Sequence, residues 1–260
     1  MPTQEHSADS SGNFHDSYHF TSSVTSATAA RNSTTSTNDI QSSTSGFIPN
    51  IACFSGHQHY DSWGGNDYDV VYRTFQSYTL GPMPDWGGET INSVSLRIHQ
   101  LADISSFFQN YSSEGSFYVV RATGAESFKN SGAWNDLTGW VSSGTYSDEV
   151  EVWSDAVTCA SDTTHNIELN STAVSYFQTQ SNTFLSGPAV SQADIALIHD
   201  SDYTDSGYPD DTAQIGTFEG LYSANMAHTT TSYRPLLTVT YGEAISDISK
   251  KNSLFFGTNF

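Results

Sequence analysis

The densest group of acidic residues lies late in the chain, in HDSDYTDSGYPDD at residues 199–211. Hard cations such as Ca²⁺ need six to eight oxygen ligands at one point, and an acidic loop can supply them. We therefore identify Asp200, Asp202, Asp205 and Asp211 as candidate calcium ligands. The spacing is not that of an EF-hand, because Asp205 stands where the loop glycine belongs. A solvated acidic turn remains the alternative, and calcium is the single cofactor that the sequence suggests.

Two histidines two residues apart, His57 and His59, precede Asp61 in the stretch GHQHYD. On a strand they would share one face and could bind zinc, but the sequence identifies no third ligand for this metal. The chain also contains no G-x-S-x-G elbow, no H-E-x-x-H pair and no Walker loop. We therefore assign no catalytic residue and expect no enzymatic activity.

Four of the five arginines lie in or beside segments with strand character, and three of them, Arg73, Arg97 and Arg234, are assigned a structural role. An arginine inside a core strand must be paired, because an unpaired buried charge is prohibitive. The chain has 28 acidic residues, so partners are abundant. The alternative is that these arginines bind an anionic ligand.

Aromatic residues are candidates for a sugar-binding platform, since flat apolar rings can stack on pyranose rings. Trp63, Trp86 and Tyr208 are the best candidates for exposure, because Gly, Pro or Asp surround them. The competing interpretation is that these rings anchor the core or its loops.

The charge balance restricts the partners of the chain. With 28 Asp and Glu against 8 Lys and Arg, the formal net charge is −20, which repels nucleic acid and anionic membrane surfaces. The N-terminal stretch MPTQEHSADSSGNF has no basic region followed by an apolar one, so we expect no signal peptide. No apolar run approaches the length of a membrane span.

Alternating apolar and polar residues dominate the middle of the chain and predict β-strands. These strands fall at residues 14–20, 69–78, 91–98, 116–122, 149–153, 194–199 and 231–242, with some strand character at 24–31. Because Gly, Ser and Asp turns separate them, the pattern is typical of an all-β sandwich. Only residues 168–180 have helical spacing, and Asn170 or Ser171 could cap one short helix there.

The pattern divides the chain into three parts: a polar N-terminal arm at 1–13, the sandwich at 14–242 and a C-terminal tail at 243–260. The tail is amphipathic, and burying each of its large side chains would yield about 1.5–3 kcal/mol. It either folds back on its own domain or docks onto a neighbouring subunit. The candidate docking residues are Ile245, Ile248, Leu254, Phe255, Phe256 and Phe260.

Three stretches together resemble a known family. VVYRTFQSYTL followed by INSVSLRIHQ, then IELNSTAVSYFQ, then SYRPLLTVTYG are similar to the jelly-roll β-sandwich of many phage virion proteins. That domain is related in pattern to DNRLRE-type carbohydrate-binding modules. The chain departs from the pattern at Gln76, Ser77 and Tyr78, where such domains usually have an Asp-Thr-Ser type turn, and it lacks the motif that names the DNRLRE group.

The resemblance implies a non-enzymatic virion component made in the host cytoplasm, most naturally a capsid decoration or cement protein, with fibre or tail-tip attachment next. Its partners would be a major capsid protein or other virion subunits, and it would form a symmetric homo-oligomer. The alternative is a carbohydrate-binding module that adheres to a glycan of a host surface or matrix.

Overall fold

The structure is a computed structural model of the whole chain. It describes residues 1–7, 14–22, 27–32, 41–42, 55–62, 66–81, 84–100, 111–112, 115–122, 150–158, 160, 163–186, 192–206, 218–222 and 235–242. These residues are mostly β-structure arranged in two sheets, as the alternating sequence predicts. Among the helices of this described part, none combines the length and the apolar character needed to cross a membrane.

The smaller sheet, sheet A, is antiparallel throughout. Its order is β1 (Thr3–Ser7), β13 (Leu236–Tyr241), β6 (Ile91–Gln100) and β10 (Thr163–Glu168). The expected polar arm at 1–13 is therefore wrong for residues 3–7, which form an edge strand. Sequence reasoning missed this strand because TQEHS has almost no apolar residues, and its position depends on the neighbouring strand.

The larger sheet, sheet B, is antiparallel except where its edge strand β7 joins β12. Its order is β7 (Tyr111–Ser112), β12 (Phe218–Tyr222), β4 (Gly56–Ser62), β5 (Asn66–Thr79), β11 (Gln192–His199), β8 (Ser116–Arg121) and β9 (Val157–Thr158). β2 (Phe14–Ser22) pairs with β5 and with β3 (Gln41–Ser42). The expected strand at 149–153 is reduced to one isolated bridge between Val120 and Val152.

Opposite the edge that pairs with β2, the long strand β5 pairs with two strands in succession. Its residues 66–72 pair with β4, and residues 74–79 pair with β11. Ser55 is buried where the two partners diverge: its hydroxyl donates to the Leu197 carbonyl at 2.7 Å and accepts from the Thr74 N–H at 3.2 Å. One side chain thus bridges the point at which β5 changes partners.

The main hydrophobic core lies between the two sheets. Val94, Leu96 and Val239 from sheet A join Ile195 and Leu197 from sheet B in one buried cluster. A second cluster lies on the opposite face of sheet B and includes residues from β5, β8 and β11, namely Phe75, Val120, Ala196 and Ile198. β11 is therefore buried on both faces, which explains why ADIALIH reads as a nearly continuous apolar run.

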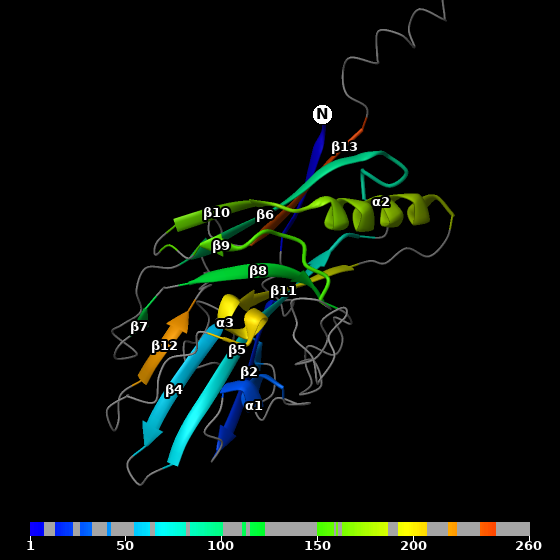
Figure 1. Cartoon of the computed structure of the whole chain (residues 1–260). Coiled ribbons are helices and arrows are strands. Elements are labelled where there is room, and N and C mark those ends of the chain that lie inside the picture. Colours follow the sequence, from blue (N-terminus) through cyan, green and yellow to red (C-terminus); the bar gives the residue numbers. More distant parts are fainter. Residues whose placement is uncertain are drawn as a thin grey trace, which may run out of the picture.

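Within the described residues three helices accompany the sheets, where the sequence predicted one. α2 (Ser171–Ser186) confirms the expected helix, and the side-chain oxygen of Asn170 accepts from the backbone N–H of Thr172 and of Ala173. Its inner face adds Ala173 and Phe177 to the main core, and Figure 1 shows the helix beside β6 and β10. It runs beyond the expected end at residue 180, and there the Ser181 hydroxyl donates to the Trp86 carbonyl at 2.9 Å.

The two short helices, α1 (Ala27–Arg31) and α3 (Asp200–Thr204), lie together on the outer face of sheet B (Figure 1). The strand character expected near 24–31 is therefore wrong for residues 27–31. ATAAR consists largely of good helix formers, and Ala30 packs on Val71 of β5. The tail at 243–260 lies outside the described residues.

Candidate functional site

The described residues contain a buried charge network between α1, α3 and β5. Arg73 lies two residues from Val71 and two from Phe75 on β5, so the three side chains share the outer face of sheet B. Its Nε and Nη2 donate to the two carboxylate oxygens of Asp202, at 2.7 and 2.9 Å. Both side chains have no exposed surface. Such two-bond pairs are the strongest that a guanidinium makes.

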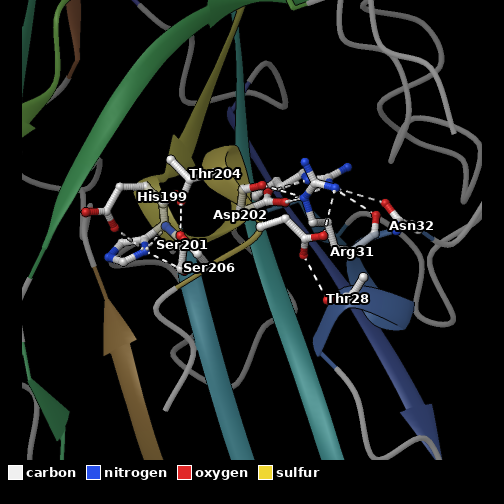
Figure 2. A network of polar contacts seen from close by, with 11 residues as sticks. Thr28, Arg31, Asn32, His199, Ser201, Asp202, Thr204 and Ser206 are labelled. Carbon is white, nitrogen blue, oxygen red and sulfur yellow. Dashed lines mark hydrogen bonds and ion pairs between the residues drawn. The ribbon is translucent and has the colours of Figure 1, made fainter. Parts of the chain in front are cut away.

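Arg31 completes this network from α1. Its Nε donates to the Asp202 carbonyl at 2.6 Å and lies 3.6 Å from the Asp202 carboxylate. Its Nη1 lies 3.8 Å from the Asp205 carboxylate, and Arg73 in turn donates to the Arg31 carbonyl at 3.2 Å. Figure 2 shows Arg31 and Asp202 meeting between the two helices. Two guanidinium groups thus face two carboxylates.

The ends of α3 position this acid. His199 caps the helix in an extended conformation, and its Nδ1 accepts from the Ser201 N–H at 3.1 Å. Asp205 ends the helix in the left-handed conformation, with φ of 53°, which Asp tolerates better than most residues. Thr28 of α1 donates to the Asp205 carboxylate at 2.9 Å, so the cap is also tied to α1.

His199, Asp200 and Ser201 are the residue types of a hydrolase triad, but their geometry is different. Ser201 Oγ and Asp200 Oδ1 both lie near the same ring atom, His199 Nδ1, at 2.7 and 2.9 Å. A triad needs the hydroxyl and the carboxylate on opposite ring nitrogens. His199 and Ser201 are also buried. The three residues therefore act as a helix cap.

Asp200 connects α3 to the start of β8, because its Oδ2 accepts from the Ser116 N–H at 3.2 Å. Burial opposes its charge, but the hydrogen bond with His199 and those from the Ser116 and Ser201 backbone outweigh burial and hold the pKa of Asp200 below its ordinary value. Nδ1 of His199 accepts from Ser201 in one tautomer and donates to Asp200 in the other.

The three candidate calcium ligands that the structure describes, Asp200, Asp202 and Asp205, do not converge on one point. The Asp202 carboxylate pairs with Arg73. The Asp200 carboxylate contacts His199 and accepts from the Ser116 N–H, and the Asp205 carboxylate accepts from the Thr28 hydroxyl. Across the described parts of the chain, no three His, Cys, Asp or Glu side chains form a group that could hold a metal ion. Acids adjacent in sequence are separated here because the turn of α3 aims them at different elements. Asp211 lies outside the described residues.

The prediction that Trp86 is exposed in a sugar-binding platform is wrong. This ring is fully buried, donates from Nε1 to Nε2 of His6 at 3.1 Å, and packs edge-to-face with Phe177 and Phe184 of α2. Its exposure was expected from the neighbouring Gly and Asp residues, but the turn folds over the end of the core. Trp63 and Tyr208 lie outside the described residues.

Other predicted positions are distributed as follows. Arg97 is half-buried on β6, away from the charge network. His57, His59 and Asp61 lie on β4, whose backbone alone is described at these positions. Arg234 and the docking residues Ile245, Ile248, Leu254, Phe255, Phe256 and Phe260 are outside the described residues.

Sequence reasoning missed Arg31, His6 and Ser55. Arg31 stands in a Ser/Thr-rich stretch with no alternation of apolar and polar residues. Its charge was the only sign of a buried role, and the chain has four other arginines. His6 and Ser55 are polar residues whose burial depends on strands distant in sequence. No local signal separates them from surface residues of the same type.

The centre of the described charge network is closed to solvent, since Arg31, Arg73 and Asp202 are all fully buried, while Asp205 at its margin is 23% exposed. Its chemistry is that of an internal cross-link between two helices and a sheet. Comparison with known proteins adds no family: no family model matches the chain, and no curated protein matches it in sequence.

Proposed function

We propose that the chain is a non-enzymatic structural protein of a phage virion, a capsid decoration or cement protein built on a jelly-roll sandwich. One observation supports this proposal above the others: the charged residues that look most reactive in the sequence are used inside the fold. Arg73 and Asp202 hold α3 against sheet B, while Arg31 adds α1. This arrangement cross-links two helices to sheet B, as a purely mechanical role would require.

The net charge of −20 fits this role. A strongly acidic body stays soluble and avoids non-specific contact with nucleic acid and anionic membranes. Because such an acidic body makes few favourable contacts of its own, the energy that binds the chain to the particle has to come from a limited apolar segment. In this proposal residues 243–260 supply that energy. Each contact is weak, but many symmetric copies on a capsid or within a homo-oligomer bind together with high avidity.

Co-sedimentation with particles of the phage that encodes the chain tests this function. Full-length protein should sediment with particles that lack it, whereas a chain without residues 243–260 should stay in the supernatant while keeping its thermal unfolding transition. A matched pair separates apolar docking from charge: Phe255→Ser with Phe256→Ser should abolish sedimentation, and Lys250→Ala with Lys251→Ala should retain it.

The outcomes also separate the neighbouring roles. Electron microscopy of labelled protein at the tail tip instead of the capsid would assign fibre or tail attachment. Failure to bind any particle, together with glycan-array binding that Trp63→Ala abolishes, would reject the virion role and establish the carbohydrate-binding module.

A further inference from the structure

The N-terminal strand β1 forms one edge of sheet A and pairs only with β13 among the described strands. Residues 1–5 are exposed or half-buried, whereas His6 is 5% exposed. The strand also donates no large apolar side chain to the core. Its attachment therefore depends on the backbone ladder, on Gln4, whose Oε1 accepts from the Asp85 N–H at 2.8 Å at the surface, and on one buried imidazole.

Both ring nitrogens of His6 are engaged, and the two bonds specify a charge state. Nδ1 lies 3.2 Å from the Thr79 carbonyl, which can only accept, so Nδ1 carries the proton. Nε2 lies 3.1 Å from Nε1 of Trp86, which can only donate, so Nε2 must be unprotonated. The site is therefore built for the neutral ring.

A second proton on His6 would point an N–H at the N–H of Trp86 and lose that bond. The groups around the ring offer little compensation. The turn at 84–90 contributes Asp85, whose carboxylate favours the charged ring, and the exposed Glu89; β5 contributes the Thr79 carbonyl, next to the buried phenol of Tyr78. Tyr176 is the only ionisable side chain on α2, and Tyr241 the only one on β13. On β1 itself, Glu5 is exposed.

We propose that β1 is a proton-sensitive latch: it is docked on β13 while His6 is neutral, and protonation of His6 releases it. Release would uncover the edge of β13, a row of backbone groups able to pair with another strand. This inference does not depend on what the rest of the chain docks onto.

The direction of the effect follows from the environment of the ring. Burial lowers the pKa of docked His6 below 6.5, and the Thr79 bond and Asp85 offset this only in part. The released strand, with an ordinary histidine, binds the proton more tightly than the docked strand. Acidification below about pH 6.5 therefore favours release, by up to about tenfold for each pH unit until the docked pKa is reached.

Hydrogen exchange read by mass spectrometry on the full chain, corrected for the intrinsic pH dependence of exchange, tests the latch. Protection of residues 3–7 should fall by up to about tenfold per pH unit below about 6.5, while protection of β6 stays constant. His6→Gln should make β1 protection independent of pH, because glutamine keeps one donor and one acceptor but does not titrate. His165→Gln, on the opposite edge of sheet A, should keep the profile of the unmodified chain.

Loss of protection in β1 and β6 together would overturn the latch, because it would report unfolding of the whole domain. The same pH profile in His6→Gln as in the unmodified chain would also overturn it. An NMR titration of the unmodified protein gives a second test: the His6 ring must titrate together with the β1 amide signals. A ring that titrates while those signals stay unchanged contradicts the proposal.

Discussion

Arg73 and Asp202 form a two-bond ion pair in which neither side chain has any exposed surface. The two residues are 129 positions apart in the chain. Their pairing fixes α3 on the outer face of sheet B, and the Arg31 contacts add α1 to the same point. The interior of this domain is thus organised by charge as well as by apolar packing.

Breaking this pair should be strongly destabilising. We expect Arg73→Ala to lower the free energy of unfolding by about 3–5 kcal/mol, because it removes the two-bond partner of a buried carboxylate. Urea denaturation measures this change. Arg97→Ala, at a half-buried position outside the network, is the control and should cost about 0.5 kcal/mol or less.

Replacing both partners by apolar residues should be milder than removing one. Arg73→Met combined with Asp202→Leu removes both charges of the pair, while Arg31 keeps the backbone carbonyl of residue 202 and the Asp205 carboxylate, so the double variant should recover part of the stability lost in each single variant. The same urea denaturation measures it. If the double variant loses more stability than the two single variants together, the ion pair is not what stabilises this part of the fold.

Gly115 should resist substitution for a steric reason. Its φ is +86°, and a Cβ at this position would lie 2.6 Å from Nε2 of His199. Gly81 has a similar φ of +79° but no atom within 4 Å of its Cβ position. Gly81→Ala should therefore cost only the backbone strain of about 1–2 kcal/mol, and Gly115→Ala clearly more. Equal losses in thermal unfolding would contradict a close contact at Gly115.

Ser55→Ala should weaken the point where β5 changes partners. The substitution removes the donor to the Leu197 carbonyl and the acceptor for the Thr74 N–H, both in buried surroundings, and should cost about 1–3 kcal/mol. Ser175→Ala, on the exposed face of α2, should be neutral or slightly stabilising, because alanine is the better helix former. Amide exchange at Thr74 should accelerate only in Ser55→Ala.

Asp200 should contribute to acid stability. Its pKa in the folded state is lowered below 3.8, so the unfolded state binds protons more readily at low pH. The contribution is fully present above about pH 3.8 and is lost as the pH falls toward the folded pKa. Asp200→Asn should flatten the acid limb of a stability–pH curve. An unchanged limb would show that the bonds with His199 and Ser116 do not favour the charged form.

The sequence determined the elements whose signal is local. Alternation predicted β5, β6, β8 and β11, and the helical spacing of Ala173 and Phe177 after Asn170 predicted α2. These predictions succeed because period and capping act within a few residues and are read without knowledge of the fold. They also gave the two-sheet, mostly β architecture.

Only the tertiary structure decided which residues meet. Arg73 was expected to be paired, but nothing near it in sequence names Asp202, and α1 was expected as strand because its own pattern is weak. Trp86 was expected at the surface and is instead buried against His6, 80 residues away. The physical reason is the same in each case. Burial and charge pairing depend on two surfaces that the fold brings together, and a single stretch of sequence contains only one of those two surfaces.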